Sequence, residues 1–307
     1  MSTQRAEKKG IETAGMLYGI GAYGLWGLFP LYWKRLSMVP ALQILMHRVA
    51  WAFIFTIILS VVLGKRKAMA RLLKEPRRLL ATIAAGFLIS ANWGIYIWAV
   101  NSGRIIETSI GYYLNPIASV ALGSLLLKER LDKGIIASSV IAMIGIAVLT
   151  ISYGKLPWIS LTLAATFSLY GLIKKMVGLD ALAGLAMETA PVFPIAIAYI
   201  VVEHLAGRGS FGTVGTVETS MLALAGAVTA IPLFLYAEGL KRIPLSRMGF
   251  LQYISPTAQL TLGVLVFGES LAGVKAVAFA FIVIALIVFA VTRIKPRTHI
   301  KPSEPGL

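Results

Sequence analysis

Apolar segments follow one another along nearly the whole chain, and short polar stretches separate them. Each segment has about 17–25 residues, enough for an α-helix to cross the roughly 30 Å hydrocarbon layer of a membrane. Helices are expected because every backbone amide in lipid must find its partner within its own segment. The sequence therefore predicts an all-α polytopic membrane protein. Its ten predicted transmembrane helices cover residues 14–33, 41–63, 79–101, 105–127, 134–152, 156–173, 181–203, 218–240, 245–267 and 272–292.

One segment returns later in the chain without a gap. Residues 111–131 read GYYLNPIASVALGSLLLKERL, and residues 251–271 read LQYISPTAQLTLGVLVFGESL. Pro116 of the first copy matches Pro256 of the second, an offset of 140 residues (256 − 116). A fixed offset indicates internal duplication. Proline-interrupted segments at corresponding positions of two halves are typical of a transporter's binding site.

The duplication also predicts how the two halves lie in the membrane. Five spans per repeat is an odd number, so the second repeat must cross the membrane in the opposite direction to the first. The predicted fold is a 5+5 inverted-topology repeat with a pseudo-two-fold axis in the membrane plane. Its units are an N-terminal tail at 1–13, the first five-helix repeat at 14–152, the second at 153–292 and a basic tail at 293–307.

The chain carries a net charge of +16, and the distribution of this charge decides what it implies. Most of the 29 Lys and Arg residues fall in loops and tails that share one side of the membrane if the N-terminus is inside. The positive-inside rule then places both termini in the cytoplasm. The charge indicates topology and attraction to membrane lipids, and no nucleic-acid partner is expected.

Composition and motifs argue against an enzyme. The absence of cysteine excludes disulfides, thiolate metal sites and cysteine nucleophiles. The three histidines are scattered, and the sequence has no G-x-S-x-G, H-E-x-x-H or phosphate-binding G-x-x-x-x-G-K-[ST] motif. We therefore expect no catalytic residue, no metal and no cofactor, and transport that does not draw on ATP hydrolysis by this chain.

Two charged residues lie deep in predicted spans. Arg48, preceded by His47, is in the second span, where a cation costs at least ~2.5–3.5 kcal/mol unless it faces a cavity or a partner. The residue 140 positions later is Glu188, at a similar depth in the seventh span. A structural Arg48–Glu188 ion pair is one interpretation. Binding of a substrate anion by Arg48 and proton coupling by Glu188 are the alternatives.

Polar and aromatic residues on other spans are further candidates for a binding cavity. Proline removes the hydrogen bond to the carbonyl four residues earlier, at Tyr112 and Gln252, and a small polar or cationic ligand suits such a position. Harmless proline kinks and hydrogen bonds between helices are the alternatives. The candidates are Trp26, Asn92, Trp93, Tyr96, Tyr112, Tyr113, Asn115, Gln252 and Tyr253, with Pro116 and Pro256 as helix breaks.

Residues at the ends of predicted spans suggest simpler roles. Tyr32 and Trp33 end the first span and are predicted to form part of an aromatic belt at the membrane interface. Glu129 and its repeat counterpart Glu269 follow the apolar part of their spans. They are predicted to be structural caps or gate contacts.

Six blocks of the sequence resemble a known family: GLWGLFPLYWK (24–34), ILMHRVAW (44–51), NWGIYIWAVN (92–101), GYYLNP (111–116), YGLIKK (170–175) and GFLQYISPT (249–257). They are similar to the RarD-type permeases of the EamA branch of the drug/metabolite transporter superfamily, over essentially the whole chain. The resemblance implies a bacterial inner-membrane permease that works by alternating access around a central cavity. It also carries over Lys174 and Lys175 as motif positions, beside the candidates above.

These features predict a secondary-active or facilitative transporter of a small organic metabolite or drug, with a midplane cavity between the two repeats. The alternatives are a non-transporting membrane scaffold or regulatory subunit, and a lipid flippase. The sequence leaves open the substrate, the direction of transport, coupling to protons, and a homodimer formed through the fifth and tenth spans.

Overall fold

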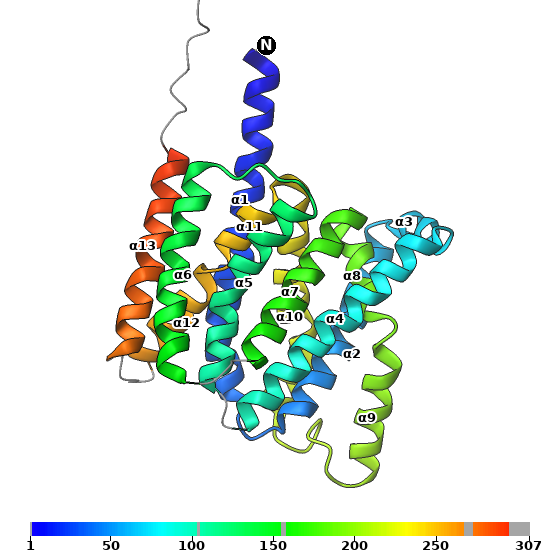
Figure 1. Cartoon of the computed structure of the whole chain (residues 1–307). Coiled ribbons are helices and arrows are strands. Elements are labelled where there is room, and N and C mark those ends of the chain that lie inside the picture. The colour runs from blue at the N-terminus through cyan, green and yellow to red at the C-terminus, as the bar shows by residue number, and fades with distance from the viewer. Residues whose placement is uncertain (1, 103–104, 155–157, 267–272, 295–307) are drawn as a thin grey trace, which may run out of the picture.

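The structure, a computed structural model, describes residues 2–102, 105–154, 158–266 and 273–294. In these ranges every regular element is a helix, and the helices form one bundle (Figure 1). They are α1 (Ser2–Arg35), α2 (Ala41–Val62), α3 (Arg66–Leu73), α4 (Pro76–Asn101), α5 (Ile105–Leu125), α6 (Lys133–Tyr153), α7 (Trp158–Val177), α8 (Ala181–Thr189), α9 (Phe193–Leu205), α10 (Thr216–Arg242), α11 (Leu245–Leu251), α12 (Ile254–Leu265) and α13 (Val274–Ile294).

Several helices are long and apolar enough to cross a membrane. Within the described residues, four helices qualify by length and composition: Ala41–Val62, Pro76–Ala99, Lys133–Ser152 and Thr216–Arg242. The bent pair α8 and α9 adds a fifth if it is one span. The all-helical prediction is therefore confirmed, and the full set of ten spans stays a prediction. The predicted basic tail lies outside the described residues from residue 295 onward, as does Glu269.

The predicted seventh span is broken into α8 and α9, which meet at an angle of 50°. Pro191 lies in the three-residue break, and Pro194 is in the first turn of α9. Proline lacks the N–H that would continue the preceding helix, but the first turn of a new helix tolerates it. The segment predicted as the span 181–203 is therefore made of two helices rather than one continuous helix.

The two matched prolines behave differently from each other. Pro116 lies inside the continuous helix α5, so its prediction as a helix break is wrong. The predicted ninth span does break, between α11 and α12 at Gln252 and Tyr253, and Pro256 is in the first turn of α12. The Gln252 carbonyl is not left free, because it accepts a hydrogen bond from the Ser255 N–H at 3.1 Å.

Helices related by the 140-residue offset exchange their packing partners. Helix α1 packs against α10 and α12, whereas α7, its counterpart, packs against α4 and α5. Helices α6 and α13 are counterparts of each other and pack side by side (Figure 1). Each of these contacts thus has a counterpart in which the two halves of the chain change roles.

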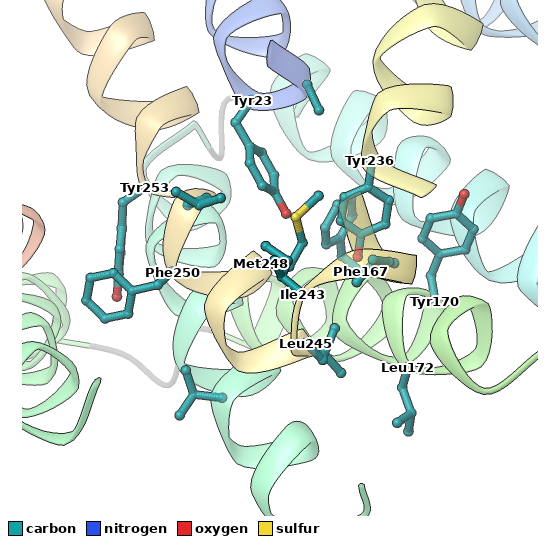
Figure 2. Packing of buried hydrophobic residues seen from close by; sticks show 14 of the residues in the cluster. Tyr23, Phe167, Tyr170, Leu172, Tyr236, Ile243, Leu245, Met248, Phe250 and Tyr253 are labelled. Carbon is teal, nitrogen blue, oxygen red and sulfur yellow. The ribbon is translucent and has the colours of Figure 1, made fainter. Parts of the chain in front are cut away.

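The largest hydrophobic core lies where α1, α5, α7, α10 and α11 meet. Tyrosines make up much of it: Tyr23, Tyr170, Tyr236 and Tyr253 are each at most 1% exposed. Figure 2 shows Tyr23 pointing from α1 toward Met248 of α11, with Tyr236 of α10 close by. This core ties the short helix α11 into the centre of the bundle.

Candidate functional site

Arg48 is the buried cation around which the first group of candidate residues gathers. It lies in the second turn of α2 and is 9% exposed. Its Nε donates a hydrogen bond to Thr229 Oγ1 of α10 at 3.1 Å. Its guanidinium carbon lies 4.8 Å from the ring centroid of Trp33 in α1 and 4.6 Å from that of Trp93 in α4. These four residues, called the Arg48 site below, join four helices.

Two further aromatic residues border the Arg48 site. Tyr96 of α4 and Tyr112 of α5 have ring centroids 5.4 Å apart, and both lie in the surroundings of Arg48. Each Trp ring stabilises the cation by ~0.5–2 kcal/mol, but removing an ion from water costs several kcal/mol. The rings therefore offset only part of the burial cost.

Glu188 is the centre of a second group, in α8. Its Oε1 lies 2.6 Å from Lys174 Nζ, and its Oε2 accepts a hydrogen bond from the Tyr170 hydroxyl at 3.0 Å. Both partners are on α7, and we call the three residues the Glu188 site. The predicted Arg48–Glu188 ion pair is wrong: in the described part of the chain Glu188 pairs with Lys174, and Arg48 has no carboxylate partner.

A cluster of aromatic rings separates the two sites. Trp26 of α1 packs against Phe167 and Tyr236 at centroid distances of 6.0 and 5.8 Å, and Tyr236 stacks on Tyr170 at 6.1 Å. Trp26 precedes Trp33 by two helical turns, or about 10 Å along α1. The structure thus places Trp26 between the Arg48 site and the Glu188 site rather than inside either.

A cavity of about 270 Å³ borders the Glu188 site. Helices α4, α7, α8 and α10 form its walls, and its charged lining residues are Lys174, Lys175, Asp180, Glu188 and Lys241. The motif residue Lys175 does not bind Glu188, because its Nζ donates hydrogen bonds to the Leu240 and Ile243 carbonyls. A small polar solute can therefore approach the Glu188 site among charges of both signs.

Some predicted residues lie away from the two sites. The Asn92 amide nitrogen donates hydrogen bonds to the Leu163 carbonyl and the Thr166 hydroxyl of α7. This is the hydrogen bonding between helices that the sequence left open as the alternative to a place in the cavity wall. His47 points elsewhere than Arg48 and stacks on Phe211 at 5.2 Å. Adjacent residues on a helix are about 100° apart, so the two side chains of this pair cannot share one face.

Tyr113 and Tyr253 form a third group on the side of α6 and α13. Their rings stack at a centroid distance of 6.5 Å, and Tyr113 also packs near Leu149 of α6. Within the described residues, the Asn115 and Gln252 side-chain oxygens and the Tyr253 hydroxyl are buried without a hydrogen-bond partner. The predicted set of residues is therefore divided among several places in the bundle.

Sequence reasoning did not single out several residues of these sites. Trp33 was predicted to belong to an interface belt, and Thr229, Tyr170 and Tyr236 were not candidates. Lys174 was carried only as part of a motif. The 140-residue offset carried a signal for two of them, because it relates Lys34 to Lys174 and the candidate Tyr96 to Tyr236. No group of three or more His, Asp or Glu side chains in the described ranges could hold a metal ion.

Comparisons with known proteins agree with this architecture. The sequence model of the EamA-like transporter family matches residues 13–151. "Uncharacterized transporter YojE" of Bacillus subtilis is 43% identical over 298 residues, which is 95% of this chain and 97% of the relative. "Protein RarD" of Streptomyces exfoliatus is 40% identical over 277 residues, 90% of this chain and 88% of the relative. A known crystal structure is similar to this chain with a TM-score of 0.69 and 20% sequence identity. The match covers 91% of this chain and 97% of the chain in that structure, and at this identity it shows the fold alone.

Charged residues buried inside an apolar helical bundle are typical of membrane transport proteins. Together with the transporter-named relatives, they define the class of this protein as a membrane transporter. The chain belongs to the EamA-like transporter family, and within it to the RarD-type permeases.

Proposed function

We propose that the protein is a secondary-active or facilitative transporter of a small organic metabolite or drug. It works by alternating access: two five-helix repeats, at 14–152 and 153–292, rock against each other around a site between them. The protein lies in the bacterial inner membrane with both termini in the cytoplasm.

The observation that carries this proposal is the relation between the Arg48 site and the Glu188 site. The two charged residues occupy corresponding positions of the repeats, and each lies inside the bundle with aromatic neighbours from other helices. Charged side chains at membrane depth are retained where they line a pathway. The cavity of about 270 Å³ opens beside the Glu188 site, which fits one end state of a rocking motion.

The exchanged packing of α1 and α7 supports the division into two inverted repeats. An inverted pair of repeats can adopt two conformations of opposite openness, because each half can take the shape of the other. The family model match also ends at residue 151, close to the proposed repeat boundary.

Transport is tested by solute counterflow with the purified protein in proteoliposomes. Vesicles are loaded with an excess of one unlabelled solute and diluted into a trace of the same solute in labelled form. Transient accumulation of label for at least one small organic solute, absent from empty vesicles, is expected. No accumulation across a broad panel of organic acids, amines, nucleosides and drugs would contradict the proposal.

Orientation is tested with single cysteines, which need no background correction because the chain has none. Gly10→Cys lies before the proposed first span, on the cytoplasmic side. Gly207→Cys lies after the proposed seventh span, on the outer side. A membrane-impermeant maleimide added to intact spheroplasts should label only Gly207→Cys. Labelling of Gly10→Cys would reverse the topology.

A further inference from the structure

The geometry points to Arg48 as the binding site for the carboxylate of a small organic acid that carries one negative charge and an apolar body. This inference rests on the proposed transport function, because it names the chemical class of the solute that the same pathway carries. The solute carboxylate would bind the two terminal Nη groups of the Arg48 guanidinium.

Charge balance inside the bundle is the first argument. Within the described residues seven ion pairs are formed, and none of them includes Arg48. The carboxylate at the corresponding position of the other repeat, Glu188, is already held by Lys174 and Tyr170. The buried cation of the Glu188 site, Lys174, is therefore paired with a carboxylate of the protein itself. No carboxylate in the described part of the chain is paired with Arg48.

Hydrogen-bond donors at the Arg48 site give the second argument. A guanidinium has five N–H donors in a planar fork that matches a carboxylate with two parallel hydrogen bonds. Thr229 accepts from Nε. The guanidinium carbon lies over the rings of Trp33 and Trp93, and an indole ring has no lone-pair acceptor to offer the Nη groups. The outer edge of the fork, which carries the Nη donors, is the part that binds carboxylates.

The surroundings of Arg48 limit the rest of the ligand. Trp33, Trp93, Tyr96 and Tyr112 border the guanidinium, so a ligand bound there contacts rings over most of its surface. One cation balances one negative charge, which favours a monocarboxylate over a dicarboxylate or a phosphate ester. No described carboxylate of this site is available to receive an ammonium group, which disfavours amines.

Binding is tested with compounds that share one body and differ in headgroup. Cyclohexanecarboxylate is compared with cyclohexylmethylamine, cyclohexylmethanol and cyclohexyl phosphate, and a series of straight-chain carboxylates varies the size of the body. The readout is the intrinsic fluorescence of the full-length protein in lipid nanodiscs, since Trp33 and Trp93 contact the guanidinium. We expect carboxylates to change the fluorescence saturably and the amine and the alcohol to have no such effect.

Variants locate the binding to Arg48. Arg48→Gln should weaken carboxylate binding about 10- to 100-fold, the effect of losing hydrogen bonds to a charged group. Arg48→Lys keeps the charge but not the fork, and it should weaken binding at least about 10-fold; it carries the test if Arg48→Gln does not fold. Arg208→Gln is the matched control, because it removes a cation from an exposed ion pair with Glu203 and should leave affinity unchanged.

The outcomes separate this inference from the proposed function. Carboxylate binding that needs Arg48, with no counterflow of the bound acid, would support the site and contradict transport. Counterflow of an amine or neutral solute at equal rates in wild type and Arg48→Gln would support transport and overturn the site. A fluorescence response to none of the carboxylates, or an equal response in Arg48→Gln, also overturns it.

Discussion

Lys174 and Glu188 form an ion pair across α7 and α8 with an Nζ–Oε1 distance of 2.6 Å. Their side chains are 8% and 5% exposed, less than in any other ion pair of the described residues. Burial makes the two charges depend on each other, because either one alone would lie in a poorly solvated environment. The pair therefore links the inner wall of the cavity to the stability of the fold.

Loss of one partner of this pair should be costly. We expect Lys174→Ala to lower the free energy of unfolding by about 3–5 kcal/mol, because it leaves the Glu188 carboxylate buried with only Tyr170 as a donor. The measurement is an SDS titration of the protein in detergent micelles. The double variant Lys174→Met with Glu188→Gln should recover most of the loss, since it leaves no buried charge. Equal destabilisation by the single and double variants would contradict the reasoning.

Gly86 of α4 is expected to tolerate no side chain. A Cβ atom at this position would overlap the backbone carbonyl oxygen of Glu188, and backbone cannot move aside as a side chain can. Gly86→Ala should cost at least about 1–3 kcal/mol of unfolding free energy by overpacking. Gly94→Ala on the same helix is the control, because no atom lies within 4 Å of its added Cβ. It should be neutral or stabilising by up to about 1 kcal/mol.

Glu129 caps the N-terminus of α11 from another part of the chain. Its two carboxylate oxygens accept hydrogen bonds from the backbone N–H groups of Leu245 at 2.6 Å and Ser246 at 2.9 Å. Glu129 is thus a cap of α11, whereas the sequence predicted a cap or a gate contact at the end of its own span. Glu129→Ala should lower the unfolding free energy by about 1–3 kcal/mol, because two N–H groups lose their acceptor. Arg130→Ala, an exposed neighbour, should have little effect in the same SDS titration.

Acid sensitivity should depend on Asp180, which lies in the loop before α8. Burial raises the pKa of this carboxyl, but hydrogen bonds from Lys65 and from the Ala183 N–H outweigh it, so the pKa is lowered from 3.8. A lowered folded-state pKa gives stability that is present above the unfolded pKa and is lost as pH falls through the folded pKa. Lys65→Met should therefore move the onset of acid unfolding to higher pH.

The control for this experiment is Lys67→Met. Lys67 is exposed on α3 and forms none of the ion pairs of the described residues. Circular dichroism between pH 7 and pH 2 follows the loss of helix in both variants. The same onset in Lys65→Met and Lys67→Met would show that the Lys65–Asp180 pair does not set acid stability.

Hydrophobic pattern predicted the positions of most helices, because a segment's apolar length is a local property. The break between α8 and α9 was missed, although Pro191 and Pro194 give a local signal for it. The opposite error occurred at Pro116. An internal proline removes one backbone hydrogen bond. Whether the helix also breaks depends on its packing against neighbouring helices, and the sequence of one segment carries no information on that packing.

The candidate site was harder to predict than the fold. Arg48 and Glu188 were paired because they correspond in the two repeats. Corresponding residues of two repeats need not touch each other, and here each is held by another helix: Arg48 by Thr229 and Glu188 by Lys174. Trp33 was assigned to the membrane interface because it ends an apolar segment. Only the three-dimensional packing shows that it contacts Arg48.

Alternating access around the Arg48 site is tested by the accessibility of position 229 from the two sides of the membrane. Thr229 touches the guanidinium, and Thr229→Cys would be the only cysteine of the chain. A membrane-impermeant maleimide is added to sealed inside-out and right-side-out vesicles in separate experiments. Alternating access predicts labelling from both sides, because each of the two conformations opens the site to one side. Labelling from one side only would contradict alternating access at this site.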